Sequence, residues 1–420
     1  MKIAQVSFAE TGGGAERVAT DLHDCFLQAG HDALLVTPRP DSTSRRSGVI
    51  PIDLDVGRGL WERAFKKIDR RLARPRAAMQ RRRGFDDPHH PWTARLLELL
   101  PWTPDVLHLH NLHGNWFDLR QLGPLSRRVP TVITLHDAWL PLSGPHWPMH
   151  VEQWDPAALK ANEALREGAL SDAPVTVVSP SRWMKGVWDA SPWSLKAGDA
   201  VVIPNGIDLE VFNPRVRPAS RQGLGGVSTR PLLLQVGLTG RGTPSHTCPE
   251  LLLDLAATLN GQTSCAIAVA NVGERWGKDR LRAFGFADDS CDVIQPGRVS
   301  DRSQLASLYK SSDLLVHSVR EDNFPSVVLE AMACGTPVVV ANTGGIPEQL
   351  DEGKHGRFFD WIGDNMAAST FYLLDEVRSL LEQSGLCDEM GRNAAEHARQ
   401  HFDRRRMADD YLALYAEIQR

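Results

Sequence analysis

The sequence predicts an α/β protein with two parallel β-sheets that are covered by helices. Short apolar runs alternate with segments of helical periodicity throughout the 420 residues, as in proteins whose strands are joined by helical crossovers. The apolar runs are short enough to be buried strands of such sheets. The length corresponds to about two to three domains. These observations together favour two doubly wound sheets in one chain.

The predicted strands fall into two groups with a polar segment between them. In the first half they are 3–8, 33–37, 106–110, 132–135, 175–178 and 201–203, and in the second half 232–236, 266–269, 293–294, 314–319 and 338–341. Segment 215–230 is polar and rich in Gly, Pro and Ser, which is typical of a linker. The last segment, 402–420, has apolar residues at helical spacing (Met407, Tyr411, Leu414 and Ile418).

The composition favours a cytoplasmic globular protein. Hydrophobic residues make up 42% and charged residues 24% of the chain, which are ordinary values for a soluble domain. The net charge of -5 argues against binding nucleic acid through bulk charge. The six cysteines are scattered without a Cys-x-x-Cys pair, as expected for reduced thiols. The chain opens directly into a strand and has no apolar stretch of about 18 residues, so neither a signal peptide nor a membrane span is expected.

The most informative segment is 314–341, which predicts a strand, a polar loop, a short helix that stops at Gly335, and a second strand. In open α/β sheets, ligands bind beyond the carboxyl ends of the strands. Ser326 and Val327 lie at the start of the helix, where backbone N–H groups suit an anion such as a phosphate.

Two carboxylates flank this helix start. Glu330 lies four residues after Ser326 and therefore on the same helix face, where it could accept the hydroxyls of a ribose. Asp322 precedes the helix and could hold hydroxyls attached to the far phosphate. An ordinary βαβ crossover with an exposed Glu fits the same spacing.

This segment resembles the donor-binding signature of the retaining glycosyltransferases of the GT-B fold, family 4. That signature has two acidic residues separated by seven positions, then Ala-Met-Ala and a Gly-x-Pro-Val strand. Asp322 stands where the family usually has Glu, and Glu330 occupies the second position. Residues 343–348 resemble the family's next loop. By this resemblance Ser326 and Val327 hold the diphosphate, Phe324 lines the donor site, Glu330 holds the ribose and Asp322 holds the sugar.

The resemblance implies two Rossmann-like domains that face a central cleft. The first domain is 1–210, the linker 211–230 and the nucleotide-sugar-binding domain 231–401, with helix 402–420 packing back on the first domain.

The first domain carries its own candidate residues. Gly13 and Gly14 follow the first strand and allow close approach of the backbone to a ligand. A dinucleotide fingerprint does not fit, because Arg17 stands where a third glycine is required. The resemblance places Gly13 and Gly14 against the donor and His136 at the reaction centre. A plain tight turn and a structural histidine are the respective alternatives.

Four further residues are expected on the acceptor side or in the cleft: Glu16, His110, Asn111 and Asp137.

No metal or cofactor is expected, apart from the nucleotide sugar as co-substrate. His108, His110 and His113 lack the acidic partners and the spacing of a zinc site. Asp53-Leu54-Asp55 has the form of a metal-binding motif of other sugar transferases, but GT-B enzymes do not use it.

One part of the family pattern is missing. The loop after the first strand of the second domain usually offers an Arg and a Lys to the departing diphosphate. Here Arg241 is present, but His246 or Thr247 stands near the place of the Lys. Because departure without a metal needs positive charge or hydrogen-bond donors, Arg241, Arg275 or Lys278 must substitute, or the protein is slow or binds without turnover.

Segment 60–83 is the most basic part of the chain, with ten Lys or Arg against two acids from 62 to 84. Its apolar residues, among them Trp61, Phe65 and Leu72, recur at helical spacing, as in a helix that lies on an anionic membrane. A solvated surface helix fits the same pattern.

We therefore predict a retaining, metal-independent glycosyltransferase, cytoplasmic or peripheral on the inner face of a membrane. It would move a hexose from a nucleotide diphosphate sugar to a glycan or lipid-linked acceptor in polysaccharide or glycoconjugate synthesis. The alternatives are a sugar phosphorylase or synthase of the same fold, or a sugar-nucleotide-binding protein with weak catalysis. The base, sugar, acceptor and linkage are left open by the sequence.

Overall fold

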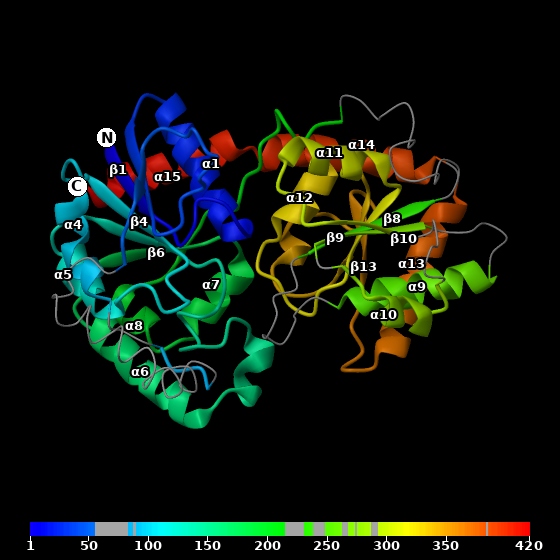
Figure 1. Cartoon of the computed structure of the whole chain (residues 1–420), viewed down its shortest axis with the longest axis horizontal. Helices are drawn as coiled ribbons and strands as arrows, with labels where there is room; N and C mark the ends of the chain where they lie inside the picture. The colour runs from blue at the N-terminus through cyan, green and yellow to red at the C-terminus, as the bar shows by residue number, and fades with distance from the viewer. Residues whose placement is uncertain are drawn as a thin grey trace. The chain divides into compact units, whose positions relative to one another are not determined.

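The computed structural model describes residues 1–54, 83–86, 90–214, 231–237, 248–262, 268–273, 275–286, 293–383 and 385–420. Most of the basic segment 60–83, most of the predicted linker 211–230, and the loop with Arg241, His246 and Thr247 lie outside these residues. The chain divides into two compact units (Figure 1). Unit 1 is Met1–Asn205 with Arg404–Arg420, and unit 2 is Gly206–Asp403.

Unit 1 is built on a seven-stranded parallel sheet in the order β3-β2-β1-β4-β5-β6-β7. Its strands are β1 Lys2–Val6, β2 Asp32–Thr37, β3 Val49–Pro51, β4 Val106–His110, β5 Thr131–Thr134, β6 Val175–Ser179 and β7 Val201–Val202. The strand order reverses beside β1, so the loops after β1 and β4 diverge there and leave room for a ligand.

Unit 2 is built on a six-stranded parallel sheet in the order β10-β9-β8-β11-β12-β13. Its strands are β8 Leu232–Gly237, β9 Ala268–Gly273, β10 Val293–Gly297, β11 Leu314–His317, β12 Val338–Ala341 and β13 Gly356–Phe359. The order again reverses beside the first strand of the unit, here between β8 and β11.

The α/β class and the two parallel sheets are confirmed. Every predicted strand is present, although β1 ends at Val6 and β11 at His317, earlier than expected, because the chain turns there into loops. The strands β3 and β13 were not predicted. Both lie at sheet edges, where a strand needs no long apolar run. Val49–Pro51 is short and ends in Pro, and Gly356–Phe359 begins with Gly-Arg.

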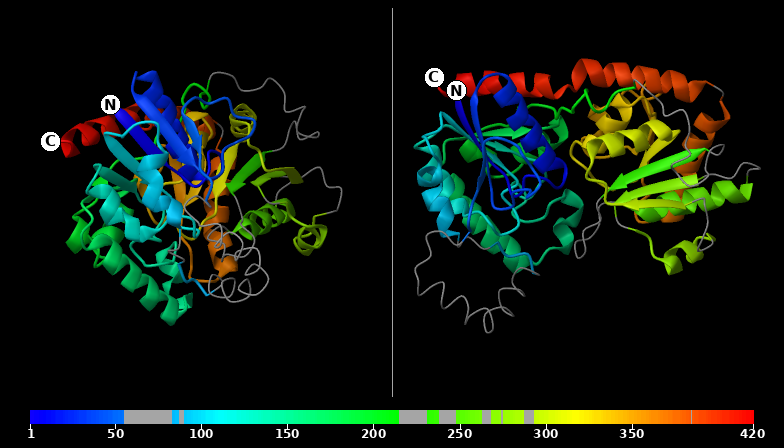
Figure 2. Two further views of the ribbon diagram at one scale, coloured as in Figure 1. Left: turned by 60° about the vertical axis from the view of Figure 1, so that its left-hand side comes forward. Right: turned by 45° about the horizontal axis from the view of Figure 1, so that its top comes forward.

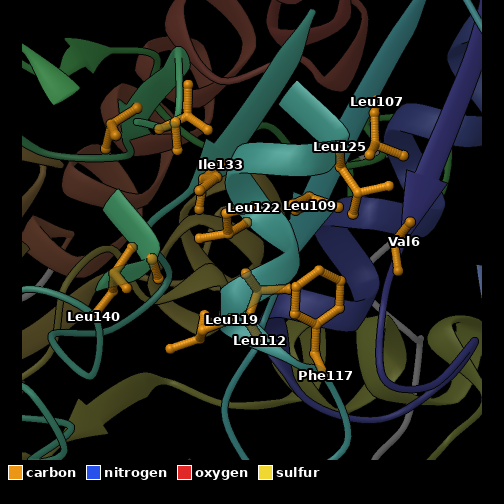
Figure 3. Packing of buried hydrophobic residues seen from close by; sticks show 14 of the residues in the cluster. Val6, Leu107, Leu109, Leu112, Phe117, Leu119, Leu122, Leu125, Ile133 and Leu140 are labelled. Atoms are coloured by element: carbon orange, nitrogen blue, oxygen red, sulfur yellow. The ribbon is translucent and has the colours of Figure 1, made fainter. Parts of the chain in front are cut away.

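Helices cover both faces of the unit 1 sheet. The helices α1 (Gly14–Gln28) and α15 (Arg404–Ile418) share one core with Ile3, Val106 and Val132. Within it the rings of Phe26 and Tyr415 lie 5.8 Å apart. The opposite face packs against α5 (Leu122–Ser126) and α6 (Pro156–Leu170). Figure 3 shows Leu107 and Leu109 of β4 among the residues of this second core.

Unit 2 has the same layering (Figure 2). One face packs against α11 (Arg302–Ser311), α12 (Ser326–Ala333) and α14 (Leu386–His401), and the other against α9 (Pro249–Gln262) and α13 (Met366–Glu382). Over the described residues, no helix combines the length and the apolar character needed to cross a bilayer.

Candidate functional site

In unit 1 the candidate residues lie at the carboxyl edge of three adjacent strands. Gly13 and Gly14 follow β1, His110 ends β4, and His136 and Asp137 follow β5. Because β1, β4 and β5 are parallel and neighbouring, their carboxyl ends meet at one edge of the sheet. The register pairs His110 with Thr134, which brings the two histidines close together.

The glycine turn is tied to the loop after β4 by Glu16. The Gly13 backbone N–H donates to one carboxylate oxygen of Glu16 at 2.9 Å, and the Asn111 side-chain amide donates to the other at 3.2 Å. A Cβ atom on Gly13 would lie 3.1 Å from the Glu16 carboxylate, so glycine suits this position. Asn111 has a positive φ of 47°, a conformation that Asn tolerates better than most residues. Three of the predicted residues, Gly13, Glu16 and Asn111, are therefore joined by hydrogen bonds.

His110 and His136 form a second contact at this edge. His110 Nδ1 lies 3.0 Å from His136 Nε2, and the two rings are stacked with centroids 5.3 Å apart. His110 is fully buried, and burial holds its pKa well below the usual value. Burial also lowers the pKa of His136, to about 4. Both imidazoles are therefore neutral at physiological pH.

Asp137 joins two further histidines. Its Oδ2 lies 2.6 Å from His146 Nδ1 and 3.3 Å from His113 Nε2. The Trp139 backbone N–H donates to Oδ1 at 3.0 Å. Burial opposes ionisation, but the His146 and His113 imidazoles outweigh it and hold the pKa of Asp137 well below its usual range. Burial lowers the pKa of His146, but Asp137 outweighs it and raises the pKa above its usual value.

The candidate ligand atoms of His113, Asp137 and His146 all lie within 4.8 Å of one another, so this cluster could hold a metal ion. Its ligand types would suit zinc. His113 and Asp137 also line a pocket with Asn111, His136 and Trp139. Sequence reasoning grouped His113 with His108 and His110 and missed His146, which follows Asp137 by nine residues in an irregular segment.

In unit 2 the predicted ribose-binding residue, Glu330, is held by Tyr309, which the sequence did not indicate. Glu330 lies on α12 with 1% of its surface exposed. Its Oε2 accepts a hydrogen bond of 2.9 Å from the Tyr309 hydroxyl, which comes from α11. The Tyr309 backbone carbonyl in turn accepts a bond of 2.7 Å from the Thr336 hydroxyl. A buried carboxylate needs such partners, and Tyr309 fixes the orientation of this one.

The helix α12 begins as the motif predicts. Ser326 is its first residue, after Pro325 at the N-cap, so the N–H groups of Ser326 and Val327 have no partner within the helix. The Pro325 carbonyl accepts a bond of 3.1 Å from the buried Gln349 side chain. This bond holds the helix start against the loop after β12.

Asp322 is fixed by its own loop and by the loop after β12. One carboxylate oxygen accepts the Asn323 backbone N–H at 2.7 Å, and the other lies 3.7 Å from His317 Nε2. Its carbonyl accepts the Gly345 N–H at 3.0 Å. Gly344 has φ of 59°, and a Cβ atom there would lie 2.0 Å from the Asp322 carbonyl oxygen, so only glycine fits. The Gly-Gly pair lets the two loops meet.

The remaining predicted residues have different surroundings. Phe324 is 5% exposed, and its ring packs edge-on against Phe402 at 5.8 Å within the core of unit 2. Arg275 and Lys278 are exposed and follow β9 at the carboxyl edge of the sheet. Asp53 is described, but Asp55 is not, so the Asp53-Leu54-Asp55 motif stays untested.

Two family models match most of the chain. The model described as Glycosyltransferase Family 4 matches residues 12–211, and that described as Glycosyl transferases group 1 matches residues 246–397. Among curated relatives, a D-inositol 3-phosphate glycosyltransferase of Arthrobacter sp. (strain FB24) is 33% identical over 217 residues, which are 51% of this chain and 49% of the relative. The enzyme of the same name from Mycolicibacterium smegmatis is 31% identical over 221 residues, or 51% and 46%. The chain thus matches about half the length of these relatives.

Solved structures share the fold over nearly the whole chain. Anabaena HepE in complex with UDP and glucose has a TM-score of 0.71 at 18% identity, with 99% of each chain covered. Sucrose-phosphate synthase from Thermosynechococcus elongatus has a TM-score of 0.70 at 19% identity, with 99% and 98% covered. At this level of identity the likeness shows the GT-B fold.

Proposed function

Because the chain belongs to the family 4 glycosyltransferases of the GT-B fold, we propose that it is a retaining, metal-independent hexosyltransferase. It moves a hexose from a nucleotide diphosphate sugar to a glycan or lipid-linked acceptor in polysaccharide or glycoconjugate synthesis, working in the cytoplasm or on the inner membrane face. The observation that carries the proposal is the donor half-site of unit 2. There a helix start, whose first N–H groups have no partner within the helix, is flanked in the sequence by two carboxylates, Asp322 and Glu330, that their neighbours hold in place.

Each group has a role in the donor half-site. Ser326 and Val327 bind the diphosphate through the helix start, where the helix dipole adds about 0.3–1 kcal/mol for an anion. Glu330 accepts the ribose hydroxyls, and Asp322 accepts hydroxyls of the hexose. Arg241, Arg275 or Lys278 supplies the positive charge for the departing diphosphate. Unit 1 contributes His136 and the Gly13–Gly14 turn toward the donor, and Glu16, Asn111 and Asp137 toward the acceptor. His110 is fully buried and acts through its contact with His136.

The transfer follows from these roles and from the family resemblance. The bond between the anomeric carbon and the diphosphate oxygen breaks, and the acceptor hydroxyl attacks from the same face. The acceptor proton passes to the departing phosphate oxygen, so no protein nucleophile is needed. Hydrogen-bond donors fixed around the diphosphate stabilise its developing charge.

The test is a panel of nucleotide sugars incubated with the protein, with release of free nucleoside diphosphate as the readout. UDP sugars come first because HepE, which shares the fold, binds UDP-glucose. D-inositol 3-phosphate belongs among the acceptors because of the names of the relatives. Glu330→Gln is the matched control. The proposal fails if no nucleotide sugar is cleaved with any acceptor or water while the protein is folded.

The same panel separates the alternatives. Release of a sugar phosphate that depends on added inorganic phosphate would indicate a phosphorylase. Nucleotide affinity without turnover would indicate a binding protein.

A further inference from the structure

A row of polar side chains crosses the buried face of the unit 1 sheet beneath α1 and α15. Gln5 of β1 and His108 and His110 of β4 have no exposed surface, and Thr134 of β5 is 3% exposed. Side chains alternate between the faces of a strand, so these residues share the face of Ile3, Val106 and Val132. Two hydrogen-bonded chains run through the row. One joins Gln5, His110 and His136, and the other joins Tyr415, His108, Thr134 and Tyr411.

The direction of the first chain is set at Gln5. The amide nitrogen lies 3.1 Å from the Ala19 carbonyl oxygen and 3.3 Å from His110 Nε2. Rotating the amide would put its oxygen against the Ala19 oxygen, where neither atom has a proton to share. The amide oxygen has no hydrogen-bond partner in the described part of the chain, so nothing there favours the rotated form. The amide nitrogen therefore donates one proton to Ala19 and the other to His110.

The donation decides where His110 carries its proton. Its imidazole is neutral, because burial keeps its pKa well below the usual value. A neutral imidazole has one N–H and one acceptor nitrogen. Since Nε2 accepts from Gln5, the proton is on Nδ1, which lies 3.0 Å from His136 Nε2. His110 thus donates to His136.

We propose that Gln5 is a positioning residue that, through His110, holds His136 in the tautomer with its proton on Nδ1. The Nε2 lone pair of His136 is occupied by the His110 N–H. Whatever His136 contacts through Nδ1, it contacts as a hydrogen-bond donor. It can donate to a hydroxyl or phosphate oxygen, but it cannot take a proton from an acceptor hydroxyl while the chain of bonds is intact.

This tautomer agrees with a transfer in which the leaving phosphate, and not a protein base, receives the acceptor proton. Only this consequence for turnover rests on the proposed function. The tautomer itself follows from the hydrogen-bond geometry, and it can be measured without any substrate.

The test uses protein with ¹⁵N-labelled histidine, because nitrogen shifts distinguish a protonated from an unprotonated ring nitrogen. His136→Gln identifies the His136 signals. Gln5→Met keeps the length of the side chain but removes the donor. Tyr415→Phe is the matched control, since it removes a buried bond of 2.7 Å to His108 and leaves the Gln5 chain untouched.

We expect wild-type His136 to be a single Nδ1–H tautomer, Tyr415→Phe to keep it, and Gln5→Met to give mixed tautomers. An Nε2–H tautomer in the wild type, or an unchanged tautomer in folded Gln5→Met, would overturn the proposal. If Gln5→Met does not fold, the wild-type spectrum can still overturn the proposal, because an Nε2–H tautomer of His136 is incompatible with the Gln5 chain.

Turnover gives a second readout. Gln5→Met should lower kcat about 10–100-fold with little change in KM, by analogy with the loss seen when a partner that orients a metal-ligating histidine is removed. Tyr415→Phe should not lower kcat. A shifted tautomer with unchanged kcat would refute the link to transfer. Absence of turnover in the wild type would count against the proposed function alone.

Discussion

The substitution Glu330→Gln tests the donor half-site most directly. The Gln side chain has the same size, and its amide oxygen can still accept the hydrogen bond of 2.9 Å from Tyr309. Packing and the bond to α11 are therefore retained. The other carboxylate oxygen becomes an NH₂ group, which cannot accept a ribose hydroxyl, and the negative charge is lost.

The expected loss can be worked out from these contacts. Charge-assisted hydrogen bonds contribute about 1.5–3 kcal/mol, which corresponds to an increase of roughly 10- to 150-fold in the Kd for the nucleotide at about 1.4 kcal/mol per factor of ten. Tyr309→Phe removes only the bond that orients the carboxylate. A buried hydrogen bond contributes about 0.5–1.5 kcal/mol, so this variant should weaken binding by no more than about tenfold.

The assay is isothermal titration calorimetry with the nucleoside diphosphate, on variants whose thermal unfolding shows that they are folded. The expected order of affinity is wild type, then Tyr309→Phe, then Glu330→Gln. An unchanged Kd in folded Glu330→Gln would refute the assignment, and Glu330 would then be a structural partner of Tyr309 only.

Three further outcomes are expected. Turnover should survive EDTA, because the proposed donor half-site needs no metal. If EDTA stops turnover, zinc or manganese restores it, and the metal fails to restore it in His146→Ala, then His113, Asp137 and His146 form a metal centre. Segment 60–83 should bind anionic liposomes at low salt, with roughly 1 kcal/mol for each bound cation, and should release them as salt rises; equal flotation with neutral vesicles would contradict this. The free energy of unfolding should fall as the pH drops below about 6.5, by about 1.4 kcal/mol per pH unit for each of His108, His110 and His136. Burial lowers their pKa values in the folded state, so the unfolded state binds more protons; urea titrations that give the same stability at pH 7 and pH 5 would contradict this.

The sequence predicts every interior strand of both sheets and two of the four edge strands, β7 and β10, but misses the edge strands β3 and β13. A strand buried on both faces must be apolar along its length, so 232–236 and 338–341 stand out in the sequence. The edge strands Val49–Pro51 and Gly356–Phe359 pair on one side only and need no such run. The donor motif was equally visible, because Asp322, Ser326 and Glu330 lie within a single turn and helix.

The residues that support the site were not visible in the same way. Tyr309 precedes Glu330 by 21 positions and reaches it only because α11 and α12 pack on the same sheet face. His146 reaches Asp137 from an irregular segment that has no periodicity.

Gln5 differs from these residues because the sequence did contain its signal. An amide in the middle of an apolar strand is costly unless its polar atoms find partners. In the register between β1 and β4, Gln5 pairs with His108. His110 lies two residues after His108 and therefore on the same face of β4. His110 in turn pairs with Thr134, two residues before His136. A polar residue inside a predicted buried strand therefore indicates a partner on the neighbouring strand. Here the chain of partners leads to the histidine that the family motif singles out.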